Sequence, residues 1–485
     1  MTTPTPQFAS ASLSRRQLLR HAGGGFGLLA LQSLLQKEQT ALSAPTGNNP
    51  LSARTPHFPT PAKAVIWLFM NGGPSQVDTW DYKPELAKRD GKPIEGFDKN
   101  TGFFTGAVGP VMKSPFAFKQ HGESGTWVSD LFPKLSTHVD DMAFVHSLHT
   151  ESNNHSPALF KINTGMTRMG FPCVGSWVTY GLGSENDSLP AFMAMSDPLG
   201  RGLPKGHAQN WGSGFLPSIL QGTWLRPKGE AIENLTPPKG MTAEQQRNQI
   251  ALLKRLSQHT PHPDAGIQRE LEARIESFEL AYRMQQIAPE TLDVNRESKD
   301  THALYGVGDK RCDHFARQCL VARRLVERGV RFIQIYSGGN ENARSWDGHS
   351  NIVKNHGGFA AETDTPIAGL LADLKQRGLL DSTLVVWGGE FGRLPIIQKG
   401  GSGRDHNPHA FTYWFAGGGT RGGTHYGSTD EIGFKAVDNR VSVNDLHATI
   451  LHLLGLNHER LTYRLNGRDF RLTDVAGRVV REIIA

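Results

Sequence analysis

The sequence predicts an α/β sandwich, in which a mostly parallel central sheet has helices on both faces and carries a helical insertion. Three observations predict it. Continuous apolar runs recur along the chain and end in glycine-rich turns, which is typical of strands buried on both faces of a parallel sheet. Helical patterns alternate with these runs. The chain has 485 residues with 54 glycines and 28 prolines, which suits one large domain with many loops.

The composition excludes several classes of protein. The formal net charge is +6, and the basic residues are scattered rather than gathered in a stripe, so nucleic-acid binding is not predicted. Three cysteines cannot form a disulfide framework. No Gly-x-Gly-x-x-Gly motif follows a predicted strand and no cysteine cluster occurs, so the sequence does not indicate a cofactor-dependent oxidoreductase.

Residues 1–44 have the layout of an export signal. The stretch "SRRQLLRHAGGGFGLLALQSLL" joins paired arginines to an apolar run too short to span a bilayer, and a polar linker follows at 45–61. "ALSA" at 41–44 is a possible cleavage site, but Pro45 disfavours it, so the segment is either removed or kept as an anchor. The segment resembles the twin-arginine signal in six residues: Ser14, Arg15, Arg16, Leu18, Leu19 and Arg20. This resemblance implies a periplasmic or cell-surface protein.

The first predicted strand is "AKAVIWLFMNGG" at 62–73, an apolar run with little alternation. "MAFVHSL" at 142–148 is expected to be the second strand, after a helix near 129–139. "LPAFMAM" at 189–195 is a weaker third. The stretch at 196–240 is rich in glycine, proline and tryptophan and is expected to be an irregular insertion.

The second half of the chain repeats the alternation. Apolar positions every three to four residues predict a helical insertion at about 242–328, which is either a cap over the site or an oligomer contact. The strand "GVRFIQIYSGG" follows it, and then a helix near 363–377. The strands "STLVVWGG" and "AFTYWFAGGG" and the helix "SVNDLHATILHLLGL" complete one domain over 62–485.

Acidic and imidazole side chains follow several predicted strands, at the carboxyl ends where α/β folds bind ligands. Carboxylates would repel one another there without a cation, and imidazoles suit zinc or another transition metal. We therefore predict a divalent metal ion (zinc, calcium or manganese) with these candidate ligands: Asp78, Asp347, His349, Glu390, Asp405 and His406. Bonds from such ligands to a metal ion are about 2.0–2.2 Å long. We therefore expect the side-chain heteroatoms of at least three of four residues to converge within about 5 Å of a common point. These residues are Asp347, His349, Glu390 and His406.

Several longer motifs carry a resemblance to a known superfamily. "DTPIAGLLADLKQRGLLDSTLVVWGGEFGR" resembles the segment of sulfatases in which a helix, a strand and a metal loop follow one another, and "VNDLHATILHLLGL" is similar to a helix near the end of their catalytic core. "DHNPHAFTYWFAG" resembles the loop of cofactor-independent phosphoglycerate mutases in which a metal- or anion-binding histidine precedes a strand. "HSPALFKINTG" aligns without a gap with the sulfatase pattern "CSPSRAALLTG". The resemblance implies the alkaline phosphatase/sulfatase fold over roughly residues 62–460.

The motifs "MNGGPSQVDTWDYKP", "SWDGH", "GGEFGR" and "GRDHNP" resemble, more closely, the exported domain-of-unknown-function family 1501, a distant relative of the sulfatases. This resemblance implies a fold more than an activity. The chain departs from the sulfatase pattern "CSPSRAALLTG" at two positions: His155 stands in place of the cysteine, and Leu159 stands in place of the arginine. The usual Asp–His metal pair is Glu390–Phe391, and Asn71 replaces the aspartate of the first strand. We therefore expect one metal ion rather than two.

In the superfamily a nucleophile attacks phosphorus or sulfur while metal ions bind the attacking and leaving oxygens. The resemblance offers His155, Ser156 and Ser152 as nucleophiles here. A second route has water attack directly, with His155 as acid or base. Arg393 and Lys161 are expected to hold the anionic ester. The predicted function is an exported metal-dependent hydrolase of the sulfatase/phosphatase type, acting on a sulfate or phosphate ester of a small molecule or polysaccharide.

The alternative is a superfamily member that binds a metal and an anionic polysaccharide or protein partner without hydrolysis. Membrane contact is expected only through an uncleaved signal segment. In this alternative, tryptophan side chains would offer stacking faces for sugars, although tryptophans are more often part of the core. The candidates are Trp177, Trp211, Trp224, Trp346, Trp387 and Trp414.

Overall fold

The computed structural model describes residues 51–98, 101–227, 230–233, 235–237 and 240–485. The predicted export signal and the first part of the predicted linker lie outside the described residues. Within the described ranges, no helix combines the length and the apolar character needed to cross a membrane.

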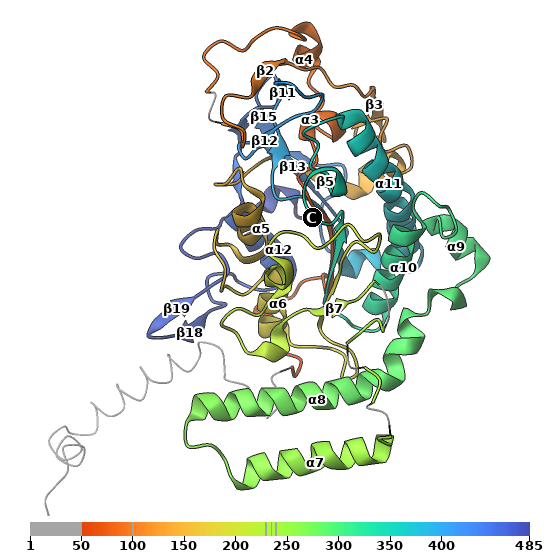
Figure 1. Ribbon diagram of the computed structural model, residues 1–485, viewed down its shortest axis with the longest axis vertical. Helices are drawn as coiled ribbons and strands as arrows, with labels where there is room; N and C mark the ends of the chain where they lie inside the picture. The colour runs from red at the N-terminus through yellow and green to blue at the C-terminus, as the bar shows by residue number, and fades with distance from the viewer. Residues whose placement is uncertain (1–50, 99–100, 228–229, 234, 238–239) are drawn as a thin grey trace, which may run out of the picture. The chain divides into compact units, whose positions relative to one another are not determined.

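A nine-stranded sheet forms the centre of the domain (Figure 1). The strand order is β14-β5-β13-β9-β1-β8-β6-β7, and β17 pairs with β5. The strands β7, β6, β8, β1 and β9 are parallel neighbours, and β13 runs antiparallel between β9 and β5. The bounds are β1 (Ala64–Met70), β5 (Met142–His149), β6 (Phe192–Met195), β7 (Thr223–Leu225), β8 (Phe332–Ser337), β9 (Thr383–Gly388), β13 (Phe411–Ala416), β14 (His425–Tyr426) and β17 (Val441–Ser442).

The middle of the sheet has the composition expected of a strand covered on both faces. All seven residues of β1 are buried, and Trp67 pairs in register with Gln334 on one side and Val386 on the other. Since neither face of β1 meets water, its side chains are apolar without alternation. The predicted mostly parallel sheet is confirmed.

Helices cover both faces of the sheet (Figure 1). On one side lie α5 (His155–Thr164), α6 (Val174–Leu182) and α12 (Val443–Leu453), and on the other α10 (Asp313–Glu327) and α11 (Ile352–Gln376). α12 begins at a capping box, because Ser442 Oγ accepts from the amide of Asp445 and the Asp445 carboxylate accepts from the amide of Ser442. The α/β sandwich is therefore confirmed.

The predicted helical insertion contains α7 (Ala243–His259), α8 (Ala265–Leu292) and α9 (Lys299–Tyr305) before α10. A capping box of Thr242 and Gln245 starts α7, and Asp264 accepts from two amides at the start of α8. Pro261 and Pro263 lie in the turn between the two helices, where their missing amides interrupt no helical hydrogen bond. α7 lies along α8 (Figure 1).

The remaining short elements form loops and small ribbons around the sheet. The helices are α3 (Gln76–Thr79) and α4 (Pro84–Lys88), with 3-10 turns η1 (Leu135–Asp141), η2 (His207–Trp211), η3 (Ser218–Leu220), η4 (Val294–Arg296), η5 (Asn342–Arg344), η6 (Leu380–Ser382) and η7 (Arg481–Ile483). The strands are β2 (Val108–Val111), β3 (Phe118–His121), β4 (Thr126–Ser129), β10 (Gly392–Arg393), β11 (Ile396–Gln398), β12 (His406–Asn407), β15 (Ser428–Thr429), β16 (Ala436–Asp438), β18 (Tyr463–Leu465) and β19 (Arg468–Phe470).

Three of the predicted elements differ in the structure. The helix predicted near 129–139 is wrong: β4 ends at its start and η1 follows, because Pro133 breaks a helical ladder and the Asp364 carboxylate accepts the next two amides. The insertion at 196–240 contributes β7, a three-residue edge strand too short to be recognised from periodicity. α11 begins eleven residues before the predicted helix at 363–377, since tertiary packing overrides the low helix propensity of its paired glycines.

The tryptophans considered as sugar-stacking faces belong mostly to the core. Trp224 is half-buried and donates its indole N–H to Ser196 Oγ at 3.0 Å. The others are at most 4 % exposed, which supports packing rather than ligand stacking: Trp177, Trp211, Trp346, Trp387 and Trp414.

Three buried histidines are expected to make folding pH-dependent. Burial lowers the pKa of His146 and of His356 to about 3 and that of His447 to about 4. In the unfolded chain they titrate near pH 6.5, so below that pH the unfolded state binds protons that the native state does not. The free energy of unfolding should therefore fall as the pH is lowered from 6.5 to 4, by up to about 1.4 kcal/mol per pH unit for each histidine.

Urea unfolding at pH 7, 6 and 5 measures this dependence. His447→Gln should flatten the slope by about one proton, since glutamine retains a donor for the carbonyl of Ile162 and does not titrate. An unchanged slope in that variant would contradict the assignment of His447 as a buried neutral group.

Candidate functional site

The direction of the strands brings five loops to one edge of the sheet. The carboxyl ends of the parallel strands β8 and β9 lead to Asp347 and Glu390. β13 runs the opposite way, so the segment before it, with His406, arrives at the same edge. β5 is antiparallel to β13, and the loop after it delivers His155 at the first turn of α5. The Gly72 and Gly73 turn after β1 completes this edge.

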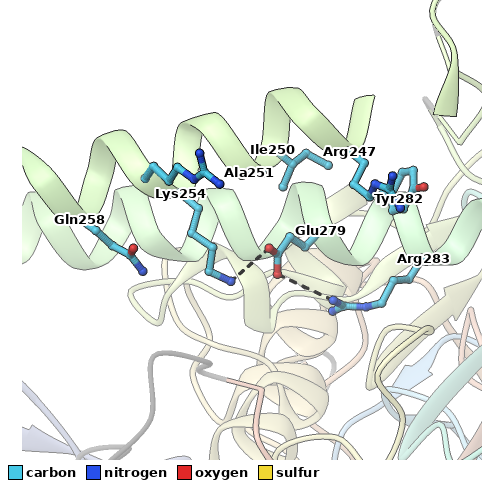
Figure 2. A pocket seen from close by; sticks show the side chains of 9 residues that line it. Arg247, Ile250, Ala251, Lys254, Gln258, Glu279, Tyr282 and Arg283 are labelled. Atoms are coloured by element: carbon cyan, nitrogen blue, oxygen red, sulfur yellow. Dashed lines mark hydrogen bonds and ion pairs between the residues drawn. The ribbon is translucent and has the colours of Figure 1, made fainter. Parts of the chain in front are cut away.

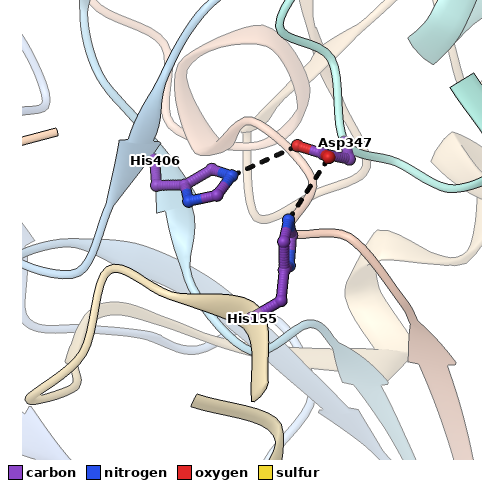
Figure 3. Close-up of side chains that lie close together, drawn as sticks. All are labelled: His155, Asp347 and His406. Carbon is purple, nitrogen blue, oxygen red and sulfur yellow. Dashed lines mark hydrogen bonds and ion pairs between the residues drawn. The ribbon is translucent and has the colours of Figure 1, made fainter. Parts of the chain in front are cut away.

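Asp347 is the centre of the cluster. Its Oδ1 lies 2.9 Å from His349 Nε2 and 3.2 Å from His406 Nε2, and it accepts from Arg393 Nη2 at 2.7 Å. Figure 3 shows Asp347 between His155 and His406. Burial alone would raise the pKa of this carboxyl, but the Arg393 charge and the contact with His155 hold it far below its usual range.

The predicted convergence is confirmed for Asp347, His349 and His406, which come from the loops after β8 and before β13. The three atoms that meet are mutually 2.9–3.2 Å apart. Glu390, the fourth residue of that prediction, reaches Asp347 only through His155.

The two histidines are oriented from behind by acceptors. His406 Nδ1 lies 2.6 Å from the carbonyl oxygen of Asn153, which only accepts, so Nδ1 carries the hydrogen. His349 Nδ1 lies 2.6 Å from Gln398 Oε1 and donates in the same way. Burial, with the charge of His155 beside it, lowers the pKa of His406 well below 6.5, so that ring is neutral and its Nε2 bears a lone pair.

With Nδ1 protonated on both rings, the two Nε2 atoms face each other at 2.9 Å and both face Asp347 Oδ1. Three acceptors then converge on one point with no hydrogen among them, in the neutral state of the rings. This arrangement fits a cation, and a ring whose Nδ1–H is held by an oxygen is the usual state of a metal-binding histidine. Two imidazoles and a carboxylate are donors that suit zinc or a similar transition metal.

His155 occupies the start of α5, where Asn154 caps the helix by accepting from the amide of Ser156. Its Nδ1 lies 2.6 Å from Glu390 Oε1, and its Nε2 lies 3.3 Å from Asp347 Oδ2. Burial by itself would lower the pKa of this imidazole, but the contacts with Asp347 and Glu390 raise it to about 9. His155 is therefore a cation at neutral pH, held between two carboxylates.

Glu390 and Asp405 support the cluster from outside it. Both oxygens of the fully buried Glu390 accept from the amide of Gly72, at 3.0 and 3.1 Å. Asp405 Oδ1 accepts from the amide of His406 at 2.7 Å and lies 3.7 Å from His349 Nδ1. The donor atoms of His349, Asp405 and His406 lie within 4.8 Å of one another, as do those of His155, Asp347 and His406.

Two of the predicted site residues, Asp78 and Arg393, are buried and form ion pairs with other protein side chains. Asp78 is held by Arg404, whose Nε and Nη2 donate to its two oxygens at 2.7 and 3.1 Å. It belongs to none of the three groups of converging donors in the described residues. The Arg393 guanidinium donates to Asp347 and to three backbone carbonyls, which leaves it to position Asp347 rather than to reach an ester.

The remaining predicted residues lie near the site with different partners. Lys161 Nζ pairs with Glu151 at 2.8 Å. Ser156 is partly exposed and faces the cavity at the site, and Ser152 Oγ donates to the carbonyl of Asn154.

A cavity of about 330 Å³ opens onto the cluster. Phe103 and Phe104 line it and are each 43 % exposed, with their rings 5.4 Å from the His406 ring and 5.1 Å from the His349 ring. The amide of Phe104 donates to Asp405 at 2.9 Å, which fastens this loop over the site. This loop is not among the site residues predicted from the sequence, although two aromatic residues between glycines in "TGFFTG" are a signal for it.

Another group of possible metal ligands lies elsewhere, at Asp197, His314 and Glu362. Arg201 donates to both carboxylates of this group, at 2.8 Å to Glu362 and 3.1 Å to Asp197. An arginine already neutralises these carboxylates, so the donor set does not call for a further cation.

The comparisons with known proteins concern the family and the fold. A family model described as "Protein of unknown function (DUF1501)" matches residues 62–484. No curated protein matches the chain. Among solved structures, the PsFucS1 sulfatase from Pseudoalteromonas sp. is similar at 11 % identity and a TM-score of 0.35, covering 82 % of this chain and 68 % of its own.

Two further solved structures are similar at this level. The alkaline phosphatase from the Antarctic bacterium TAB5 has 11 % identity and a TM-score of 0.32, covering 84 % of this chain and 100 % of its own. The lipoteichoic acid synthase LtaP from Listeria monocytogenes has 9 % identity and a TM-score of 0.31, covering 88 % and 79 %. With TM-scores this low, the description of the fold rests on the sheet topology.

Proposed function

The chain belongs to the DUF1501 family, and from the site at the edge of its sheet we propose that it is an exported metal-dependent hydrolase acting on a sulfate or phosphate ester. The observation that carries this proposal is the meeting of His349 Nε2, His406 Nε2 and Asp347 Oδ1 with their hydrogens directed elsewhere. The cluster opens onto a cavity large enough for a small ester or a sugar unit.

A divalent ion held by Asp347, His349 and His406, when bound, supplies Lewis acidity to an ester oxygen and makes water more acidic. The protein's own groups do the rest. Arg393 fixes the Asp347 carboxylate, and the acceptors behind the two imidazoles fix their tautomers. Gly72 holds Glu390, which in turn holds the Nδ1 proton of His155.

His155 has the proton state of a general acid rather than of a nucleophile. With a pKa raised to about 9 by its two carboxylate partners, the ring is protonated at neutral pH and has no free lone pair for attack. It lines the cavity, where its proton is available to the leaving oxygen. Water is therefore the attacking group in this proposal, and Ser156, which lines the same cavity, is the alternative.

Metal analysis of the purified protein, combined with an ester panel, tests the function. We expect about one transition-metal ion per chain and turnover of an aryl sulfate, an aryl phosphate or an aryl phosphodiester. Turnover should disappear on chelation and return with the metal. Bound metal without turnover of any ester would favour the binding-only alternative, and a chain that takes up no transition metal would overturn both.

We also propose export by the twin-arginine route, for which the six residues of the signal motif are the support. Replacing Arg15 and Arg16 with lysines should leave the protein inside the cell, as measured by fractionation. Unchanged export of that variant would count against the route.

A further inference from the structure

Two phenylalanine side chains leave apolar surface open at one wall of the cavity at the candidate site. Phe103 and Phe104 line this cavity and are each 43 % exposed, and their rings are nearly perpendicular with centroids 5.2 Å apart. The Phe103 ring lies beside His406 and the Phe104 ring beside His349. Apolar surface that lines a cavity next to such a cluster is available to a ligand.

The loop that carries these rings is anchored to the site. Asn153 Nδ2 donates to the carbonyls of Thr101 and Gly102, at 3.2 and 2.9 Å, and the amide of Phe104 donates to Asp405. Gly102 permits this close approach, because a Cβ atom there would overlap Asp405 Oδ2. Three hydrogen bonds therefore hold the two rings beside the cluster.

The rest of the outer cavity wall is polar. Lys205 Nζ pairs with Glu341 Oε2 at 3.1 Å, and both side chains remain accessible to solvent. Asn342 is exposed, and Asn154 and Ser156 are partly exposed. These side chains offer hydrogen-bond donors and acceptors to a molecule that lies against the two rings.

The two kinds of wall restrict the alcohol part of the ester. An apolar alcohol would cover the rings, but it would also displace water from the polar wall without replacing its hydrogen bonds, which is unfavourable. A small polyol would satisfy the polar wall and leave the rings in water. A sugar ring carries C–H groups on its faces and hydroxyls around its edge, so it meets both walls at once. The cavity of about 330 Å³ is near the lower end of the usual range for ligand sites and suits one sugar unit.

A pocket elsewhere in the structure lacks this combination. It lies between α7 and α8 and has a volume of about 430 Å³, and its Lys254 and Arg283 both pair with Glu279 (Figure 2). None of its lining residues belongs to the three donor groups of the described residues, so an ester bound there would not meet the candidate metal ligands. The residues that line the cavity at the candidate site all lie outside 242–328, so the helical insertion does not form the cap that was one of its two expected roles.

We propose that the ester cleaved at this site is carried by a sugar, whose ring packs against Phe103 and Phe104 while its hydroxyls bond to the polar wall. This inference rests on the proposed hydrolase function. Water forms the new bond to sulfur or phosphorus, and the bond to the sugar oxygen breaks. That oxygen takes the proton of His155, and the proton given up by the water restores His155. The products are a free sugar hydroxyl and inorganic sulfate or phosphate.

Matched esters test the substrate class on the purified full chain. Monosulfates and monophosphates of hexoses and hexosamines, esterified at ring positions and at carbon 6, are compared with controls that carry the same acid group. Cyclohexyl and cyclohexylmethyl esters retain a six-membered ring without hydroxyls, and glycerol esters retain hydroxyls without a ring. We expect kcat/KM of the best sugar ester to exceed that of every control at least about tenfold. A control ester that is turned over as efficiently as the best sugar ester overturns the inference.

Two variants separate the contributions of the two walls. Phe104→Ala should raise KM for the best sugar ester about three- to tenfold, with little change in kcat, and should raise it less for the glycerol ester, which has no ring to pack. Asn342→Ala should raise KM for the sugar ester more than for the cyclohexyl esters, which have no hydroxyls to bond. Metal content, measured for each variant, shows whether the ligand cluster is intact. Trp127→Ala is the matched control, since this side chain is 39 % exposed in β4 and does not line the cavity, and it should change neither KM.

The outcomes distinguish this inference from the proposed function. Turnover of aryl esters without turnover of any sugar ester would overturn the sugar assignment and leave the hydrolase function standing. A Phe104→Ala variant that affects sugar and glycerol esters alike would do the same. A protein that turns over no ester at all would overturn both.

Discussion

His349→Ala is expected to lose the bound metal and to reduce ester turnover at least about a thousandfold, because only a bound ion lowers the pKa of water toward about 7. The variant removes one of the three atoms that converge near Asp347 Oδ1. The remaining pair, His406 and Asp347, leaves a site of two side chains, fewer than a stable zinc site uses. Metal per chain and kcat on the best ester of the panel are the two measurements.

Three further variants show whether the loss is specific. Gln398→Ala removes only the acceptor behind His349 and should weaken metal binding by about 10- to 100-fold while retaining the ligands. His409→Ala changes a histidine in the loop that carries His406; it belongs to none of the three donor groups in the described residues, so the variant should retain metal and turnover. His155→Gln should keep the metal and lose turnover, since the proposed proton donor is gone. If His349→Ala still holds one metal per chain, the assigned ligand set is wrong.

The location of this site could be predicted from the sequence because topology determines it. Buried apolar runs that end in glycine-rich turns fix where parallel strands stop, and the polar residues after those stops share one edge. That is why Asp347 and Glu390 could be placed near each other from the chain alone. His406 reached the same group because the strand after it was recognised, although its antiparallel direction was not.

Pairings among charged residues could not be predicted in the same way. Asp78 follows β1 much as Glu390 follows β9, yet a buried arginine from a distant loop neutralises it. Lys161 was expected at the ester and instead pairs with Glu151. Which carboxylate receives which cation depends on side-chain positions to within an ångström, and strand order does not determine them.

Arg404→Met is expected to destabilise the fold by about 3–5 kcal/mol, because it leaves the Asp78 carboxylate buried without its partner. Both side chains are inaccessible to solvent, and the guanidinium also donates to the carbonyls of Leu394 and Met112. Burial alone would raise the pKa of Asp78, and the Arg404 charge is the main influence that lowers it. Without that charge, Asp78 should take up a proton on folding, so the variant should lose less stability relative to wild type at pH 4 than at pH 7.

Urea unfolding of wild type and variant at both pH values measures the difference. Arg464→Met is the matched control, since its partner Asp469 and the arginine itself are more than half exposed, and such pairs contribute less than about 1 kcal/mol. Adding Asp78→Leu to Arg404→Met should recover part of the loss, because an apolar side chain has no charge to desolvate. If Arg404→Met alone costs no more than the exposed control, then Asp78 is not held by Arg404 in solution, and its carboxylate is again available as a ligand for the metal cluster.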